Sequence, residues 1–248
     1  QLHPLIDSER TGDRYLETFW TTILNKEVFR GEFQNIDSNA KNFYVESTVV
    51  PTLDERGDIY EFISIMFDIT ASKEQEHELE RQLYIDSLTG LPNRTALHRA
   101  IELNHGHKLM LINVDDFNTV NTIYGENIGD ELIIELAKRL QKMLSSENLT
   151  LYRHSGDEFA ILANEKVPSE FFREDTILMA HQLNSIELQC AVHTITVRMR
   201  IGAAQGLKSG NPRSLVSMAS LALREAKKSK QAYSFYSEVV DNILHLEE

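Results

Sequence analysis

The sequence predicts an α+β protein built from two units, and three patterns along its 248 residues carry this prediction. A helical pattern followed by three strand-like runs occupies residues 13–67. A long apolar run ending in a polar, acidic cluster, Lys108–Phe117, indicates a buried central strand that delivers side chains at its carboxyl end. Two apolar runs within Tyr152–Leu162, joined by a tight turn, predict a β-hairpin with an acidic tip.

The first unit is predicted as one helix and a three-stranded antiparallel meander. Apolar residues recur at helical spacing over Asp13–Leu24. Strand-like runs follow at residues 29–36, 41–50 and 59–67, separated by turn signals at residues 37–39 and 54–57. A helix followed by a meander implies a small α+β layer.

A charged helix is predicted to connect this layer to the rest of the chain. Ser72–Tyr84 is rich in Glu, Lys, Arg and Gln, lacks Gly and Pro, and places Leu79 and Leu83 four residues apart. With only about two heptads, an isolated coiled coil of this segment would be marginal. The segment is therefore either a helix that pairs two subunits or a solvated connector.

The second unit continues with helices on both sides of the predicted hairpin. Apolar residues at helical spacing predict a helix over Glu131–Leu144, and residues 236–248 are expected to form a helix leaving the domain. We therefore expect boundaries at 1–70, 71–85 and 86–248.

Composition indicates a soluble protein, which we expect to be cytoplasmic. No apolar run approaches the roughly 18 residues that span a bilayer, and no signal-peptide pattern opens the chain. A single cysteine, Cys190, excludes an internal disulfide and is expected in the core. The net charge of −13 argues against binding nucleic acid, because phosphate contacts need clustered Lys and Arg. A single nucleotide can still bind through cations and backbone N–H groups.

The hairpin tip has the chemistry of a metal and phosphate site. Gly156 allows a sharp turn and close approach of a ligand, while Asp157 and Glu158 offer hard oxygen ligands suited to Mg²⁺. An acidic turn alone is usually just solvated. Here it is expected to lie near the polar end of the Lys108–Phe117 run, and two such strand ends together make a site.

Two motifs resemble the GGDEF family of diguanylate cyclases, which condense two GTP molecules into cyclic di-GMP. Asp86–Arg94 is similar to the family's domain-opening motif, and Ser155–Phe159 is similar to its signature loop, with Ser in the first Gly position. Ala222–Lys227 also resembles the last helix of such domains. The resemblance runs from about Asp86 to at least Tyr236 and implies a nucleotidyl-cyclase-like fold, with a central, mainly antiparallel sheet flanked by helices.

Part of the first unit resembles the second half of PAS sensor domains. The segments concerned are Phe29–Phe33 and Phe67–Thr70. The earlier strands of that fold have no counterpart here, so no PAS ligand can be assigned.

The resemblance implies roles for residues at the two strand ends. Catalytic roles fall on Asp157 and Glu158, without deciding which takes the proton of the attacking hydroxyl. The metal, Mg²⁺ or Mn²⁺, is expected at Glu158, the Val114 carbonyl, Asn113 and Asp157.

Further residues are implied in binding the substrate, GTP. Asn121 and Asp130 match the positions that read guanine, and a carboxylate can accept from both N1–H and N2–H of that base. Lys227 matches the lysine that reaches the phosphates. The remaining contacts are expected from the signature loop and from a cradle of backbone N–H groups: Ser155, Gly156, Asp116, Phe117 and Asn118.

The chain departs from the family pattern at several positions. Asn113 stands where the family has its first metal-binding Asp, which removes one negative charge and should weaken metal binding. Asp115 is not expected to compensate, because along a strand it would lie roughly 7 Å further on. Four other departures together remove positive charge around the phosphates: Asn118, Thr122, Glu126 and Gln231. Ser146 and Leu149 occupy the positions of the Arg and Asp of the family's product-inhibition motif, which is therefore absent.

Two functions therefore stay open. One is a PAS-linked, Mg²⁺-dependent diguanylate cyclase, weakened by Asn113 and working as a homodimer through the PAS half and the linker helix. The other is a degenerate, GTP-binding regulatory module that controls a partner or an attached EAL phosphodiesterase domain. A purely structural dimerisation domain is a third reading, and it would bind no GTP.

Overall fold

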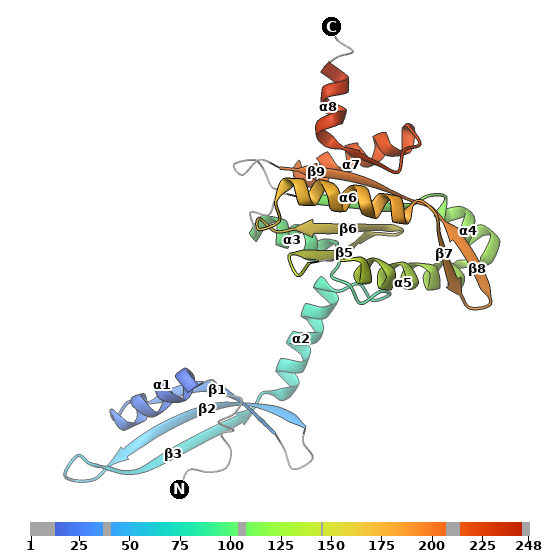
Figure 1. Cartoon of the computed structure of the whole chain (residues 1–248). Helices are drawn as coiled ribbons and strands as arrows, with labels where there is room; N and C mark the ends of the chain where they lie inside the picture. The colour runs from blue at the N-terminus through green and yellow to red at the C-terminus, as the bar shows by residue number, and fades with distance from the viewer. Residues whose placement is uncertain (1–12, 37–40, 104–107, 145, 207–213, 245–248) are drawn as a thin grey trace. The chain divides into compact units, whose positions relative to one another are not determined.

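The chain forms two compact units, Gln1–Glu80 and Arg81–Glu248 (Figure 1). In this computed structural model the described residues are 13–36, 41–103, 108–144, 146–206 and 214–244. The turn expected at residues 37–39 and the end of the helix expected to reach residue 248 lie outside them. Within the described ranges, none of the helices has both the length and the apolar character needed to cross a membrane.

The first unit is a three-stranded antiparallel sheet with one helix packed on it. Helix α1 (Asp13–Leu24) precedes β1 (Phe29–Ile36), β2 (Asn42–Leu53) and β3 (Ile59–Asp68), in the sheet order β1-β2-β3. One buried cluster joins α1 to β1 and β2 because apolar side chains alternate along each strand: Phe19, Ile23, Phe29, Phe33, Val45 and Val49. The helix and meander predicted from the sequence are present.

Strand β2 is longer than predicted, because it continues through Pro51. Proline has no N–H to donate to a ladder, which usually ends a central strand. Here Pro51 pairs with Phe62 next to a register shift between Thr52 and Leu53, so the missing donor falls where the ladder is already irregular.

Helix α2 (Thr70–Tyr84) spans the boundary between the two units. Its start is attached to the first unit, where the backbone N–H of Tyr44 donates to Thr70 Oγ1 at 2.9 Å and Lys73 pairs with Glu32 at 2.9 Å. None of its residues is buried, in keeping with its charged sequence.

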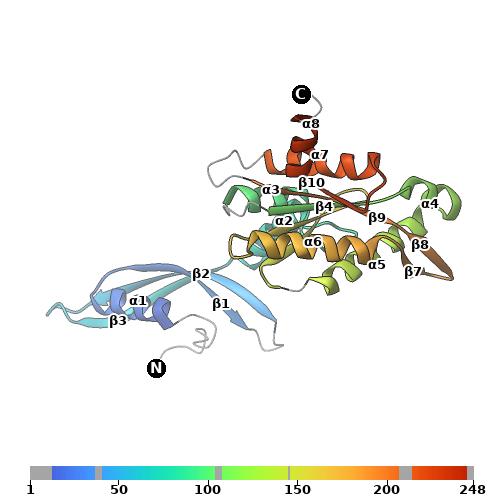
Figure 2. The same cartoon turned by 45° about the horizontal axis from the view of Figure 1, so that its top comes forward.

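The second unit places helices on both faces of a five-stranded sheet (Figure 2). The sheet order is β10-β9-β4-β6-β5, and every pairing is antiparallel except β9 with β10. Its strands are β4 (Lys108–Val114), β5 (Leu149–Ser155), β6 (Glu158–Ala163), β9 (Met199–Gln205) and β10 (Tyr233–Phe235). The helices are α3 (Arg94–Leu103), α4 (Phe117–Tyr124), α5 (Glu126–Met143), α6 (Ser169–Leu183), α7 (Ser214–Lys228) and α8 (Tyr236–Leu244). This confirms the predicted α+β class and its mainly antiparallel central sheet.

Two apolar cores, one on each face, hold this sheet. Helices α5 and α6 cover one face, while α3 and α7 cover the other. Every residue of the central strand β4 is buried, as its unbroken apolar run predicts. Alternate β4 residues therefore contribute to opposite cores, and the polar residue at its end, Asn113, lies on the same face as Leu109 and Leu111.

Helix α7 lies unusually close to β9 because of a glycine. A Cβ added to Gly202 would overlap the backbone of Ala219 and Leu223. This approach, together with the buried Ala222 and Ala226, sets the position of the last turn of α7, which carries Lys227.

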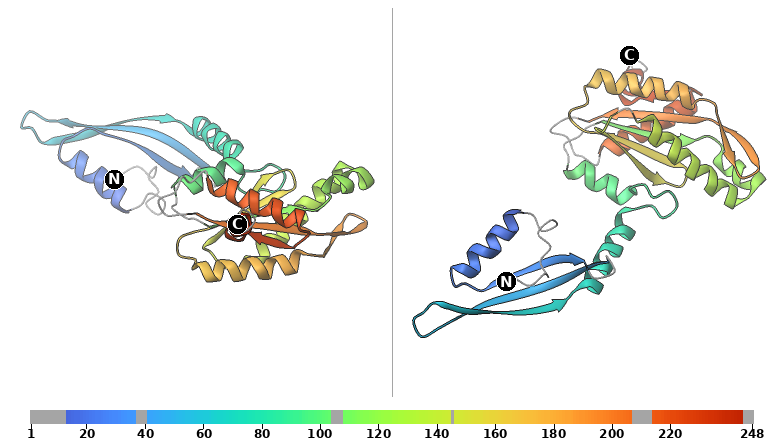
Figure 3. Two further views of the ribbon diagram at one scale, coloured as in Figure 1. Left: turned by 90° about the horizontal axis from the view of Figure 1, so that it is seen from above. Right: turned by 60° about the horizontal axis from the view of Figure 1, so that its bottom comes forward.

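A short hairpin, β7 (Ile186–Cys190) and β8 (His193–Val197), extends beside α4 and α5 (Figure 3). Tyr124 of α4 contacts His193 with ring centroids 5.2 Å apart. Cys190 is buried, as expected, and burial, with smaller contributions from Glu131 and Glu135, raises the pKa of its thiol.

Candidate active site

The polar end of β4 meets the hairpin tip, as the sequence predicts. Pairing of β4 with β6 places Asn113 directly opposite Glu158, and the Val114 N–H donates to the Asp157 carbonyl at 3.3 Å. Residues opposed across an antiparallel pair share a face of the sheet. Asn113 and Glu158 thus share the face covered by α3 and α7.

Asn113 bridges a cation and a carboxylate. Lys227 Nζ donates to Asn113 Oδ1 at 2.6 Å, and Asn113 Nδ2 donates to Asp157 Oδ2 at 3.1 Å. The Asn113 residue is only 8% exposed, so both contacts orient its amide. Among the described residues no carboxylate forms an ion pair with Lys227, which leaves the ammonium two further N–H donors.

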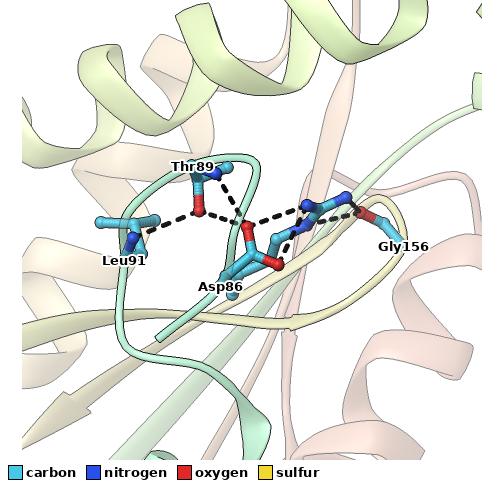
Figure 4. Close-up of polar contacts among 5 residues, drawn as sticks. Asp86, Thr89, Leu91 and Gly156 are labelled. Carbon is cyan, nitrogen blue, oxygen red and sulfur yellow. Dashed lines mark hydrogen bonds and ion pairs between the residues drawn. The ribbon is translucent and has the colours of Figure 1, made fainter. Parts of the chain in front are cut away.

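A clamp from the domain-opening motif holds the hairpin tip (Figure 4). Arg153 Nη1 pairs with Asp86 Oδ1 at 2.9 Å, while Arg153 Nη2 and Nε donate to the Gly156 carbonyl at 2.9 and 3.2 Å. The Thr89 hydroxyl also donates to Asp86, at 2.7 Å. Gly156 has φ 48°, a left-handed conformation that glycine adopts without strain, as the sequence predicted for a tight turn.

The charge of Asp86 is stabilised within this clamp. Burial opposes ionisation, but hydrogen bonds from Thr89 and Arg153 outweigh it and lower the pKa of the Asp86 carboxyl. Asp86 and Arg153 both lie in sequence segments singled out above, but the sequence assigned neither residue a role. The sequence does show an acidic residue in one motif and a basic residue in the other, but no local pattern indicates that the two form an ion pair.

A histidine lies against the second acidic residue of the loop. His154 Nδ1 is 3.4 Å from Glu158 Oε2, and its side chain is only 9% exposed. Within the described ranges, neither ring nitrogen has a hydrogen-bond partner of good geometry. Sequence reasoning assigned no role to His154.

A buried amide oxygen, that of Asn121, lies where α4 meets α5. Asn121 Oδ1 is buried and has no hydrogen-bond partner among the residues that the structure describes, and a Cβ on Gly129 would overlap it. Glycine at 129 is therefore required for this approach of Asn121 to α5. Asp130, the next residue along α5, is exposed.

The turn between β4 and α4 presents backbone N–H groups. Asp116 has φ 54°, and α4 begins at Phe117, so the N–H groups of Phe117 and Asn118 have no acceptor within the helix. A turn of this kind favours an anion. Ser155 and Gly156 lie exposed on the hairpin tip.

Two charged residues near the site are already paired with each other. Arg200 Nε lies 2.8 Å from Asp115 Oδ2, and Arg200 Nη1 donates to the Gln231 carbonyl at 2.6 Å. Asp115 follows the end of β4 and is committed to Arg200. It therefore does not replace the carboxylate that Asn113 lacks, as the sequence led us to expect.

The oxygen atoms here suit a hard divalent cation in type, but they carry little charge. The candidate donors are the Glu158 carboxylate, the Val114 carbonyl and the Asn113 amide oxygen, which already accepts from Lys227. No cluster of three or more His, Cys, Asp or Glu in the described ranges is placed to hold a metal ion. The site thus fits Mg²⁺ or Mn²⁺ in donor chemistry with one negative charge fewer than an aspartate at position 113 would supply.

The family described as "Diguanylate cyclase, GGDEF domain" matches residues 83–232, more than half of the chain. The chain therefore belongs to the GGDEF family of diguanylate cyclase domains, which confirms the resemblance drawn from Asp86–Arg94 and Ser155–Phe159.

Similar proteins agree with this assignment. The chain is 27% identical to the signalling protein YkoW of Bacillus subtilis, over 96% of this chain and 33% of that protein. It is 29% identical to the diguanylate cyclase VdcA of Vibrio cholerae, over 64% of this chain and 49% of that protein. It thus spans only about a third to a half of these curated relatives. An X-ray structure of a diguanylate cyclase/phosphodiesterase from Caldicellulosiruptor saccharolyticus is 30% identical with a TM-score of 0.55, covering 63% of this chain and 94% of that one.

Proposed function

We propose that the second unit binds GTP at the junction of β4 and the β5–β6 hairpin and acts in cyclic di-GMP signalling as a weakened diguanylate cyclase. One observation carries this proposal. Asn113, Asp157 and Lys227 form a single hydrogen-bonded cluster, with Glu158 directly opposite Asn113. Phosphoryl transfer needs a positive charge beside the phosphates and a group that accepts the hydroxyl proton, and an ammonium and carboxylates at one sheet end can supply these.

The contact between α4 and α5 supports guanine as the base. The buried Asn121 Oδ1 lacks a donor, and an unpaired buried acceptor costs about 1–3 kcal/mol unless a ligand satisfies it. Guanine offers N1–H and N2–H donors, which Asn121 and Asp130 would share. The N–H groups of Phe117 and Asn118, together with the exposed tip residues Ser155 and Gly156, would face the phosphates.

The reaction joins the 3′-hydroxyl of one GTP to the α-phosphate of another and releases pyrophosphate. Lys227 holds phosphate oxygens and offsets part of their charge, while Asp157 or Glu158 accepts the hydroxyl proton. A bound Mg²⁺ or Mn²⁺, held by Glu158, the Val114 carbonyl and Asn113, would supply additional positive charge at the phosphates. Because each domain holds one GTP, two domains must face each other, and we propose that the first unit and α2 bring two chains together.

A specific observation favours the second candidate function, a GTP-binding regulatory module without turnover. The Asn113 oxygen already accepts from Lys227, so a metal ion bound there would share this oxygen with an ammonium at a site that lacks one negative charge. Such a module would pass a signal to a partner or to an attached EAL domain. The PAS-like character of the first unit would make it the sensing part under either function.

One experiment separates these functions. The purified chain is incubated with GTP and Mg²⁺ or Mn²⁺, the nucleotides are resolved by chromatography, and GTP binding is measured in parallel. Cyclic di-GMP establishes the cyclase, and binding without product establishes the regulatory module. Absence of binding at every metal concentration refutes both and leaves a structural domain.

A further inference from the structure

The Lys227 ammonium lies at the Asn113 side-chain oxygen, which a divalent cation would need as a ligand. It donates to Asn113 Oδ1 at 2.6 Å, and the same amide donates to Asp157 through Nδ2. An amide has one oxygen, whereas an aspartate at this position would have a second oxygen for a metal. The hydrogen bond to Asp157 holds the amide with its oxygen toward Lys227.

A metal ion sharing this oxygen would lie beside another cation. Mg²⁺ binds oxygen at about 2.1 Å, so an ion on Asn113 Oδ1 would be no further than about 5 Å from the Lys227 nitrogen. Two cations at that separation repel, and the neutral amide does not compensate. Metal and ammonium therefore compete at this position.

Lys227 is also suited to bind phosphate directly. Its residue is exposed at the end of α7, and Asn113 uses only one of its three N–H donors. The other nearby cation, Arg200, is paired with Asp115 and the Gln231 carbonyl. Lys227 thus has an uncommitted positive charge next to the acidic hairpin tip.

We propose that Lys227 is the resident cation of this site, so that the domain binds the triphosphate of a guanine nucleotide without a divalent metal. This inference rests on the proposed GTP site and specifies its cation requirement. Asn113 is then a feature that selects an ammonium over a metal, and Asp157 is the positioning residue that orients the amide.

The test measures binding of a GTP analogue with a methylene group between the α- and β-phosphorus atoms, which cannot react. Its dissociation constant is determined by calorimetry on the full chain, in EDTA and in excess Mg²⁺. We expect the two constants to differ by less than about tenfold, the low end of the effect of losing one metal-site partner. Lys227→Met should weaken binding in EDTA by about tenfold or more, the effect of losing a hydrogen bond between charged groups, while Lys227→Arg should retain most of it.

Lys228→Met is the matched control, because Lys228 is the adjacent exposed lysine of the same helix. It should leave both constants unchanged. If Mg²⁺ tightens binding of the unmodified chain tenfold or more, the inference is wrong while the GTP site stands. If Lys227→Met binds in EDTA as well as Lys228→Met does, Lys227 is not the cation. Absence of binding in both conditions refutes the GTP site itself.

Discussion

Replacing Asn113 by Asp should create a stronger divalent-cation site in a domain that otherwise keeps its fold. The new carboxylate would lie 2.6 Å from the Lys227 ammonium and 3.1 Å from an Asp157 oxygen, if the present distances are kept. At an effective dielectric constant of about 20, the attraction is about 6 kcal/mol and the repulsion about 5 kcal/mol. Solvent at the exposed Lys227 weakens both interactions, and the attraction to Lys227 nearly cancels the repulsion from Asp157.

This balance between attraction and repulsion changes when Mg²⁺ is present. The metal would be attracted to the new carboxylate at position 113 and to that of Asp157, and its charge would offset their mutual repulsion. We expect the Mg²⁺-dependent affinity for GTP to rise about 10- to 100-fold, and cyclic di-GMP formation to rise with it. The assay is a Mg²⁺ titration of GTP binding, with product resolved by chromatography.

Gln141→Glu is the matched control, since it adds the same charge at an exposed position near the end of α5. It should leave metal dependence unchanged. If Asn113→Asp folds normally and neither metal-dependent affinity nor turnover rises, the account of the metal deficit is refuted.

Four further predictions concern stability and reactivity. Asp86→Asn should lower the free energy of unfolding by about 1–3 kcal/mol, measured by urea denaturation, because it weakens the clamp on Arg153; an unchanged midpoint would contradict this. Because the folded pKa of Asp86 is lowered, its stabilisation is present above about pH 3.9 and is lost as the pH falls through the folded value, so Asp86→Asn should flatten the acid side of the stability profile. Gly202→Ala should cost about 1–3 kcal/mol by forcing α7 outward, and equal thermal midpoints would show that α7 shifts freely. The buried Cys190 thiol should react with a thiol reagent only on unfolding.

Part of the secondary structure could be predicted from the sequence because those signals are local, whereas α3, α4, α6 and β7 to β10 were not predicted. Apolar residues at helical spacing located α1 with the bounds that the structure has, and the unbroken apolar run before Asn113 predicted the central strand. Helix α5 begins at Glu126, earlier than the predicted Glu131, because its first five residues contain a glycine and only one large apolar residue, Ile128, too few to show helical spacing. The region of the site was predicted from the two strand ends, and the roles of its residues stay predictions.

The sequence by itself determined the family, the helix and meander of the first unit and the two strand ends that form the site, since each depends on motifs or on spacing within one segment. Only the tertiary structure decided which side chains meet. Lys227 reaches Asn113 across 114 positions of sequence, and Arg153 reaches Asp86 across 67. Such pairs depend on sheet register and on how closely α7 approaches β9 at Gly202, and no periodic pattern in the sequence indicates either of these.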